Sequence, residues 1–439
     1  MTGIAAGLTG FAVLLGLMAI RIPIAVAMLA VGIGGYGLVN GWMPLLAYLN
    51  TNTYYQFSTY SLSVIPLFVL MGEFATHAGM SRALYRAAAA FLGHLRGGLA
   101  MASIGGCAAF GAICGSSLAT AATMGQVALP EMRRYNYSGA LSTGSLAAGG
   151  TLGILIPPSV ILVLYALMAE QNIAKMFVAA MIPGIIAAIG YMIAVAVYVR
   201  IRPGEGPAAP AASWAERLAS LRETWSIILI FGVVVVGMYG GWFTPTEGAA
   251  VGAFGAFVLA VLHGGMRLQG LIACLQGTAK TSAMIFLIML GAEMFNAFLS
   301  ATQTPMLAAT MIAESGLSPM MVLAAILLLY LAMGCVMDSM SMLLLTIPIF
   351  YPIIAGLDFG MSREDTLIWF GILAVVVVEV GLITPPVGMN VFVINGMARD
   401  VPMWESFRGV MPFLISDVIR ILLLIAFPAI TLGLVRALG

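Results

Sequence analysis

Long apolar stretches, separated by short polar ones, dominate the pattern of this 439-residue chain. Most of them are long enough to cross about 30 Å of hydrocarbon, which predicts membrane-spanning helices. The chain is therefore predicted to be an all-α, polytopic membrane protein. We expect its spans at residues 3–20, 23–41, 60–80, 139–171, 177–199, 224–242, 246–264, 281–299, 367–397 and 410–434.

Two of these stretches contain adjacent prolines: Pro157 and Pro158 lie within 139–171, and Pro385 and Pro386 lie within 367–397. Proline lacks a backbone N–H and its ring clashes with the preceding turn, so neither stretch can form one continuous helix. Inside a membrane, irregular backbone is tolerated where it lines a cavity or is buried in protein. We therefore predict two broken helices that border a cavity.

Two further apolar segments, 98–132 and 319–352, are interrupted by small and polar residues in "AICGSSLATAAT" and "GCVMDSMSML". We interpret each segment as a re-entrant hairpin of two half-length helices, with one long helix as the alternative. The stretches 81–97 and 300–318 lead into these hairpins. They are predicted to be interfacial arm helices, with ordinary loop helices as the alternative.

The two halves of the chain resemble each other. Four matches occur in the same order at offsets of 222, 219, 228 and 229 residues, and they are Pro23 with Pro245, Gly72 with Gly291, Pro157 with Pro385, and Pro183 with Pro412. A slowly drifting offset is typical of a duplicated unit with small insertions. We expect a first repeat at 1–205, a cytoplasmic linker at 206–223 and a second repeat at 224–439.

The distribution of positive charge predicts that the repeats are inverted. Each half is expected to contain five spans and one hairpin, and an odd number of crossings places the second half in the opposite orientation. In that topology three Lys and Arg residues lie outside and one lies within a span. The others lie in cytoplasmic segments, where membrane proteins carry an excess of Lys and Arg. The fourteen residues expected inside are Arg21, Arg82, Arg86, Arg96, Arg133, Arg134, Arg200, Arg202, Arg217, Arg222, Arg267, Lys280, Arg399 and Arg408.

Composition narrows the function. Hydrophobic residues make up 62% of the chain and charged residues 8%, with a mean hydropathy of +1.07, whereas soluble domains carry about 25% charged residues. The net charge of +1 gives no sign of nucleic-acid binding. No catalytic, nucleotide-binding or cofactor motif is present, and no His or Cys cluster suggests a transition metal. We expect a protein that is not an enzyme, with cysteines that serve as buried hydrophobic residues.

The hairpin tips and the proline breaks are expected to converge on one site. They offer carbonyl, hydroxyl and carboxylate oxygens, which suit an alkali or alkaline-earth cation, and their half-helix N-termini attract an anion. Helix packing through small residues is the alternative. The candidates are Gly115, Ser116, Ser117 and Thr120, with Thr151, Gly153, Pro157, Pro158 and Ser159, in the first half, and Asp338, Ser339 and Ser341, with Thr384, Pro385, Pro386, Gly388 and Asn390, in the second.

Acidic residues inside spans are functional candidates by default. We expect Asp338 to bind a cation or to gate, and Glu379 to hold the second broken segment. Glu73 and Glu293 occupy equivalent places in the two halves, which favours a structural or gating role. Asp417 and Arg420 are three residues apart on one predicted helix, so an internal ion pair is expected.

Four motifs carry a resemblance to a known family: "GAICGSSLATAATMGQVALPEM", "GGTLGILIPPSVILVLYA", "GGWFTPTEGAAVG" and "GLITPPVGMNVFVINGMA". They resemble the large membrane subunit of tripartite ATP-independent periplasmic (TRAP) transporters over essentially the whole chain. The resemblance implies an elevator-type transporter of the bacterial inner membrane. It also implies Na⁺-driven uptake of an organic acid such as a C4-dicarboxylate or sialic acid, with a periplasmic binding protein and a separate four-helix small membrane subunit as partners.

By the same resemblance, two Na⁺ sites and one substrate site are expected, with Na⁺ as the coupling ion and no cofactor. No arginine is assigned to the substrate carboxylate, and a stand-alone Na⁺- or H⁺-coupled carboxylate carrier is the alternative function. The first Na⁺ site would comprise Gly115, Ser116, Ser117, Gly153, Pro157 and Pro158. The second would comprise Asp338, Ser339, Thr384, Pro385, Gly388 and Asn390, and the substrate would contact Thr120, Ser159, Ser341 and Asn390.

Overall fold

The structure, a computed structural model, describes residues 3–314 and 316–438, and within these ranges it contains helices and no strand. The ends of the two expected repeats, residues 1, 2 and 439, lie outside the described residues, as does residue 315. The elements of the first half are α1 (Gly3–Ala19), α2 (Ile24–Asn40), α3 (Trp42–Phe57), η1 (Tyr60–Ser63), α4 (Val64–His77), α5 (Met80–Leu92), α6 (Gly98–Cys114), α7 (Ser117–Arg134), α8 (Gly139–Leu155), α9 (Val160–Met168) and α10 (Ile173–Ile201).

The second half begins after an irregular connection at residues 202–213. Its helices are α11 (Trp214–Tyr239), α12 (Pro245–Leu262), α13 (Leu268–Ala301), α14 (Thr304–Glu314), α15 (Pro319–Gly334), α16 (Ser339–Ala355), α17 (Arg363–Gly381), α18 (Met389–Met397), α19 (Met403–Ala426) and α20 (Ala429–Leu438).

Membrane-spanning helices are present in both halves. Among the described residues, α10, α11, α12, α13 and α19 are each long and apolar enough to cross a bilayer. Two bent pairs bring the number to as many as seven: α3 with η1 and α4, bent by 60°, and α8 with α9, bent by 45°. The ten expected spans exceed this number partly because α1 and α2 have only 17 residues each, about 25 Å of helix.

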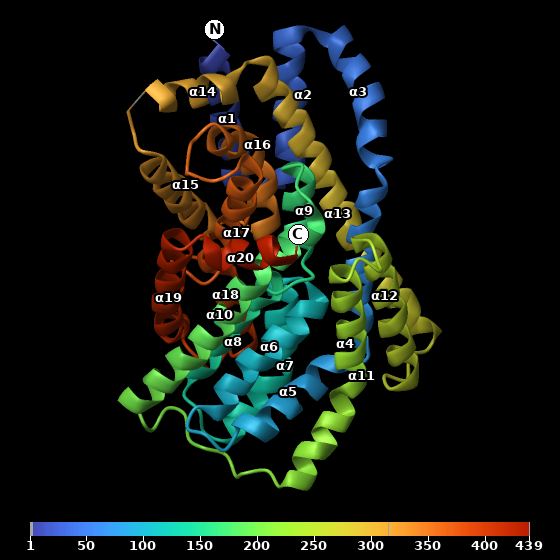
Figure 1. The fold of residues 1–439 in the computed structure, drawn as a ribbon, viewed down its shortest axis with the longest axis vertical. Helices are drawn as coiled ribbons and strands as arrows, with labels where there is room; N and C mark the ends of the chain where they lie inside the picture. Colours follow the sequence, from blue (N-terminus) through green and yellow to red (C-terminus); the bar gives the residue numbers. More distant parts are fainter. Residues whose placement is uncertain (1–2, 315, 439) are drawn as a thin grey trace.

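The predicted hairpins and breaks are confirmed as helix pairs. Helices α6 and α7 are separated by two residues, and α15 and α16 by four. The first broken helix is α8 and α9, interrupted at 156–159, and the second is α17 and α18, interrupted at 382–388. Figure 1 shows α6 and α7 in the lower part of the molecule and α15 and α16 in the upper part. The hairpins therefore approach the middle from opposite ends, as the inverted arrangement requires.

The structure also departs from the expected elements. Helix α3 was not predicted, because its sequence "WMPLLAYLNTNTYYQF" mixes apolar residues with Asn, Thr and Gln, and only Leu45 of the helix is buried. Helix α11 begins at Trp214, inside the expected linker, where Ser213 and Glu216 form a capping box. The expected last span is two helices, because the chain breaks before Pro428, which has no N–H to continue α19.

The helices form two groups that lie side by side. In the first group α2 packs against α13, and α4 packs against α12 and α13. In the second group α8 packs against α6, α7 and α19, while α17 packs against α15 and α16. Helix α5 contacts α6 of the second group and α4 of the first, and α14 contacts α16 of the second group and α13 of the first. The two predicted arm segments are therefore helices that connect the groups.

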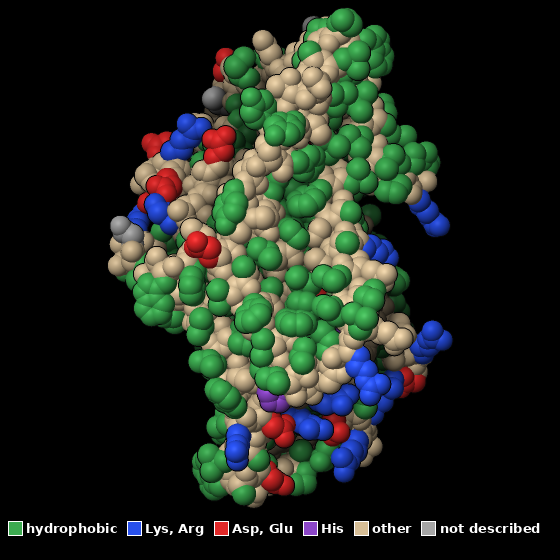
Figure 2. Space-filling model, turned by 90° about the vertical axis from the view of Figure 1, so that its right-hand side faces the viewer, with side chains coloured by type: hydrophobic (Ala, Val, Ile, Leu, Met, Phe, Trp, Pro, Cys, Tyr) green, Lys and Arg blue, Asp and Glu red, His purple; other side chains and the backbone are tan. Residues whose placement is uncertain are grey.

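Figure 2 shows an apolar surface over the middle of one face, with Lys and Arg side chains gathered toward the lower end. In Figure 1 this end carries α5 and the connection between α10 and α11, where Arg82, Arg86, Arg217 and Arg222 occur in the sequence. An apolar belt with basic residues at one end is typical of a membrane protein whose cytoplasmic side is that end.

Candidate functional site

The tip of the first hairpin is built by two residues. Helix α6 ends at Cys114, and Gly115 has φ = +65°, a left-handed conformation in which glycine has no steric penalty. Ser116 then caps α7, and its hydroxyl accepts a hydrogen bond of 3.4 Å from the N–H of Ala119. The chain thus reverses within the protein, and the N-terminus of α7 lies at the tip.

The tip of the second hairpin uses a carboxylate for the same purpose. Asp338 caps α16, and its side chain accepts a hydrogen bond of 3.0 Å from the N–H of Ser341. The cap places the N-terminus of α16 at the tip, and an acidic residue there is favoured by the helix dipole. Asp338, which was expected to bind a cation or to gate, is the N-cap of α16 in the structure.

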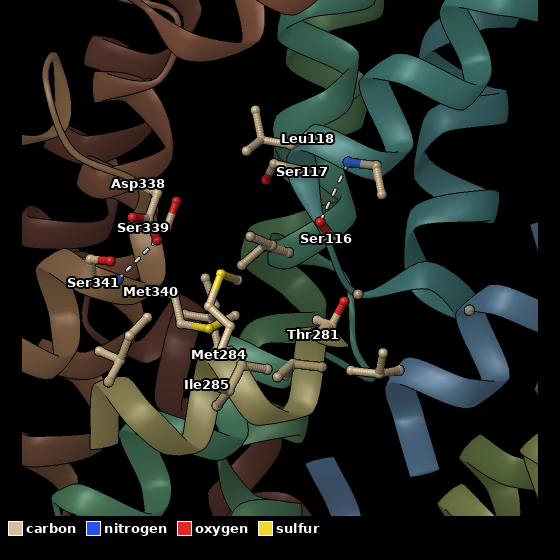
Figure 3. A pocket seen from close by; sticks show the side chains of 18 of the residues that line it. Ser116, Ser117, Leu118, Thr281, Met284, Ile285, Asp338, Ser339, Met340 and Ser341 are labelled. Carbon is tan, nitrogen blue, oxygen red and sulfur yellow. Dashed lines mark hydrogen bonds between the residues drawn. The ribbon is translucent and has the colours of Figure 1, made fainter. Parts of the chain in front are cut away.

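A cavity of about 700 Å³ lies between the two tips and the first helical group. Figure 3 shows Ser116, Ser117 and Leu118 on one side of the cavity, Asp338, Ser339 and Ser341 opposite, and Thr281, Met284 and Ile285 of α13 below. Residues of α2, α4, α8 and α9 also line the cavity, and the charged side chains among its described lining residues are Glu73 and Asp338. The lining of this cavity therefore combines serine hydroxyls, two acids and many apolar groups.

The first broken helix packs directly behind the first tip. Ser159 is fully buried and caps α9. Gly153 lies so close to the hairpin that a Cβ at this position would be 2.5 Å from Oγ1 of Thr120 and 3.0 Å from the carbonyl oxygen of Ser116. Oγ1 of Thr120 is itself buried and has no hydrogen-bond partner among the described residues. Glycine at 153 thus leaves room for oxygen atoms of the tip and the break to lie together.

The second break reaches across to the first half. Asn390 is fully buried on α18, and its amide nitrogen donates a hydrogen bond of 3.2 Å to the carbonyl oxygen of Ala147 on α8. A Cβ at Gly150 would be 3.1 Å from this amide nitrogen and 3.1 Å from the carbonyl oxygen of Ser117. Oδ1 of Asn390 has no hydrogen-bond partner among the described residues. Asn390, expected in the second Na⁺ site, therefore lies beside residues of the first.

The remaining residues of the second break lie near the second tip. Oγ1 of Thr384 donates a hydrogen bond of 2.6 Å to the carbonyl oxygen of Val380. The carbonyl oxygen of Pro385 is 3.5 Å from Sγ of Cys335, which follows α15. Gly388 caps α18 in a left-handed conformation with φ = +59°. The second break is thus linked to the second hairpin through its backbone carbonyl.

Glu379 is the carboxylate at the centre of this arrangement. It is fully buried near the end of α17, three residues before the second break begins. One of its oxygens accepts a hydrogen bond from Oγ of Ser117, and the other accepts one of 2.7 Å from Oγ of Ser339. Glu379 was expected to hold the broken segment. The structure shows instead that it joins the tips of both hairpins, with donors that come from opposite halves of the chain.

Predicted substrate residues do not all line the cavity. Ser341 does, whereas Thr120, Ser159 and Asn390 lie behind its wall. Glu73 lines the same cavity, but Glu293 lines a separate one of about 910 Å³ and accepts a hydrogen bond of 2.6 Å from Tyr48. Met284 and Ile285 of α13 were not predicted, because no sequence feature separates apolar residues that line a cavity from those that face lipid.

Two other predictions concern single side chains. The ion pair between Asp417 and Arg420 is confirmed, with a distance of 2.7 Å and both side chains buried. Cys114 differs from the expected buried cysteine, because it is half-buried and lines the cavity. Within residues 3–314 and 316–438, no group of three or more His, Cys, Asp or Glu residues is arranged to hold a metal ion.

Comparison with known proteins decides the family. Residues 11–430 match the family profile described as tripartite ATP-independent periplasmic transporter, DctM component. The chain belongs to this DctM family. It is 38% identical over 381 residues to the C4-dicarboxylate TRAP transporter large permease protein DctM of Pseudomonas aeruginosa, and the match covers 87% of each chain. Membership makes the chain a multi-pass transporter permease rather than an enzyme.

Other DctM-family relatives differ in substrate. The sialic acid TRAP transporter large permease protein SiaM of Vibrio cholerae is 31% identical over 374 residues, which cover 85% of this chain and 86% of SiaM. Among solved structures, the YdaH transporter of Alcanivorax borkumensis has the same overall fold, with a TM-score of 0.63 and 14% identity over 89% of this chain and 90% of that one. The fold is therefore a transporter fold, and substrate varies among the permeases that this chain resembles.

Proposed function

We propose that this DctM-family permease carries out Na⁺-coupled uptake of an organic acid, such as a C4-dicarboxylate, sialic acid or a related carboxylate, across the bacterial inner membrane. The cavity between the hairpin tips carries this proposal. The N-termini of α7 and α16 both lie at its wall, and the free N–H groups and positive dipole end of a helix N-terminus favour an anion.

The charges of the cavity support coupling to a cation. Glu73 and Asp338 are both acids, and among the described residues no Lys or Arg lines the cavity. A carboxylate substrate that entered alone would add negative charge to a region of low dielectric constant, which is unfavourable. Cations that bind with the substrate offset this charge, so the substrate binds well only when the cations are present. This is the reciprocal linkage on which symport depends.

Oxygen atoms at the tips and breaks supply the proposed Na⁺ sites. In the first, the tip residues Gly115, Ser116 and Ser117 meet the break at Gly153, Pro157 and Pro158, with the unpaired oxygens of Thr120 and Asn390 close by. In the second, we place Asp338 and Ser339 of the tip with Thr384, Pro385 and Gly388 of the break, because the carbonyl oxygen of Pro385 lies 3.5 Å from Sγ of Cys335, three residues before Asp338. Hydroxyl and carbonyl oxygens of this kind suit a hard cation such as Na⁺.

The movement that we propose is of the elevator type. The group that contains both hairpins and both broken helices carries the substrate and the ions past the group that contains α2, α4 and α13, while α5 and α14 act as arms. The cavity supports this assignment because it lies between the two groups. A periplasmic binding protein delivers the substrate, and a separate four-helix small subunit completes the tripartite assembly that the family description names.

Uptake into proteoliposomes tests this function. The vesicles would contain this permease with its small subunit, and a Na⁺ gradient and purified binding protein would be supplied separately and together, with choline replacing Na⁺ in the control. Uptake that requires both is the expected result. Uptake without the binding protein would instead identify a stand-alone carrier, and uptake without a Na⁺ gradient would contradict Na⁺ coupling.

A further inference from the structure

A single buried carboxylate occupies the point where the two hairpin tips meet. Glu379 is fully buried, and it is not part of any ion pair among the described residues. Its partners are the hydroxyls of Ser117 and Ser339. These serines are the first residues of α7 and α16, so they occupy the same place in the two hairpins.

The hydrogen bonds of the two serines have a defined direction. An ionised carboxylate is an acceptor only, whereas a serine hydroxyl has one proton to donate and two lone pairs. When Glu379 is ionised, Ser117 and Ser339 each donate that proton to it, so each hydroxyl has only lone pairs left for its other contacts. Both serines line the cavity, while Glu379 does not. The hydroxyl oxygens that the two serines present to the cavity can therefore accept a hydrogen bond or bind a cation, but they cannot donate a hydrogen bond.

An accepting hydroxyl discriminates between ligands. It can contact a cation, but it cannot donate a hydrogen bond to the carboxylate of a substrate. We propose that Glu379 is a positioning residue that fixes both tip serines as cation-facing oxygens, so that one carboxylate tunes both Na⁺ sites. This inference rests on the proposed Na⁺ coupling, and it assigns the substrate carboxylate to other donors, such as the N–H groups at the starts of α7 and α16.

The first half has no second carboxylate for this purpose. Thr151 precedes Pro157 by the same number of residues by which Glu379 precedes Pro385. Oγ1 of Thr151 donates a hydrogen bond of 2.7 Å to the carbonyl oxygen of Ala148 and lies 3.2 Å from the hydroxyl of Tyr191, so its hydrogen bonds among the described residues go to α8 and α10 and not to the tip serines. The duplicated halves thus share one acidic residue.

Na⁺ binding by the purified protein tests the inference directly. The unfolding temperature would be measured as NaCl replaces choline chloride, because a ligand that binds the folded state stabilises it. Loss of a group that orients metal ligands typically weakens metal binding by about 10–100-fold. We expect Glu379→Gln to raise the half-saturating Na⁺ concentration by about tenfold or more, because the amide must donate to one serine and so reverses that hydroxyl.

Three further variants separate orientation from charge. Glu379→Asp keeps the charge but is too short to reach both serines, so it is expected to weaken Na⁺ binding. Ser117→Ala with Ser339→Ala removes both hydroxyls, and adding Glu379→Gln to this pair is expected to have no further effect on Na⁺ binding. Glu364→Gln is the matched control, because Glu364 lies on the same helix but is exposed and paired with Lys175.

The outcomes separate this inference from the proposed function. A Na⁺ titration of Glu379→Gln that matches Glu364→Gln would overturn the inference, and so would a further loss when Glu379→Gln is added to the two serine variants. If Glu379→Gln does not fold, Glu379→Asp decides: it must raise the half-saturating Na⁺ concentration relative to Glu364→Gln, and a titration that matches Glu364→Gln would overturn the inference. If the unchanged protein does not respond to Na⁺, the proposed coupling itself fails.

Discussion

The amide nitrogen of Asn390 on α18 donates a hydrogen bond of 3.2 Å to the carbonyl oxygen of Ala147 on α8. This bond joins the broken helices of the two halves. It acts beside the hydrogen bonds of Glu379 to Ser117 and Ser339, which also connect the halves. The central site is therefore held together by polar contacts between the two halves as well as by apolar packing, and a change at one break affects residues at the other.

Replacing Asn390 tests this connection. Asn390→Ala removes a buried hydrogen bond, which typically costs about 1–3 kcal/mol when a partner is left unpaired, and it also removes an oxygen beside the first tip. We expect a lower unfolding temperature, a weaker Na⁺ response and reduced uptake. Asn395→Ala is the control, because its amide bonds Val401 and Ser406 within the same half. Equal Na⁺ responses of the two variants would exclude Asn390 from the site.

The close packing around Gly153 leads to a second prediction. A methyl group there would approach Oγ1 of Thr120 to 2.5 Å, which is closer than atoms pack, so the first tip must move away from the first break. We expect Gly153→Ala to abolish Na⁺-dependent uptake and to lower the unfolding temperature. Gly396→Ala provides the comparison, since no heavy atom lies within 4 Å of its added methyl group. Uptake by Gly153→Ala at the level of Gly396→Ala would contradict the close approach.

The buried ion pair of Asp417 and Arg420 gives a third prediction. Arg420 also lies over the ring of Tyr191, whose hydroxyl donates a hydrogen bond of 2.8 Å to Asp417. Removing one member leaves an unpaired buried charge, which typically costs about 3–5 kcal/mol. Arg420→Met alone should therefore destabilise the protein strongly, and adding Asp417→Asn should restore part of the loss. Thermal unfolding of the single and double variants measures this, and a double variant less stable than Arg420→Met would contradict the pairing.

The irregular connection between the halves, residues 202–213, contains Glu205, and this residue predicts that the stability of the protein depends on pH. Burial raises the pKa of Glu205, but hydrogen bonds from Tyr198, Ser138 and Arg202 outweigh it and hold this pKa below its usual value. A carboxyl whose pKa is lower in the folded state adds stability above its unfolded pKa, about 4.3, and loses it as the pH falls through the folded pKa. The stability difference between the unchanged protein and Glu205→Gln should therefore have its full value at neutral pH.

The measurement is the unfolding temperature of both proteins from neutral pH downward through the lowered folded-state pKa of Glu205, across which the carboxyl takes up its proton. The difference between them should narrow as the pH falls. Glu223→Gln is the matched control, because its exposed carboxylate lies 4.0 Å from Arg86, and exposed pairs contribute little. A difference for Glu205→Gln that widens toward low pH would show that the hydrogen bonds do not favour the charged form.

The hairpins and breaks were predictable from the sequence because their signals are local. Adjacent prolines interrupt a helix wherever they occur, and "CGSS" and "MDSM" place a turn and a cap within a few residues. Helix α3 was missed for the same reason. Its Asn, Thr and Tyr residues give no apolar period, and its place in the structure depends on the neighbouring α2. Local pattern thus predicted elements best where backbone chemistry decides them.

The contacts within the site were less predictable. Ser117 and Glu379 are 262 residues apart in the chain, and no motif indicates that one carboxylate serves both hairpins. Asn390 was assigned to the second tip because its motif follows the second break, yet α18 packs against α7 and α8. A side chain can contact residues of either half of the chain. Which half it contacts depends on how the helices pack across one another, and this is a property of tertiary structure.

The cysteines at the tips have a practical consequence. Cys114 ends α6 and lines the cavity, whereas Cys335, which follows α15 beside Pro385, is buried, as are Cys107 and Cys274. The protein therefore carries one native thiol at each hairpin tip. A membrane-impermeant thiol reagent applied from either side of the bilayer would read the accessibility of each tip, so that alternating exposure can be followed in the natural sequence without introducing a label.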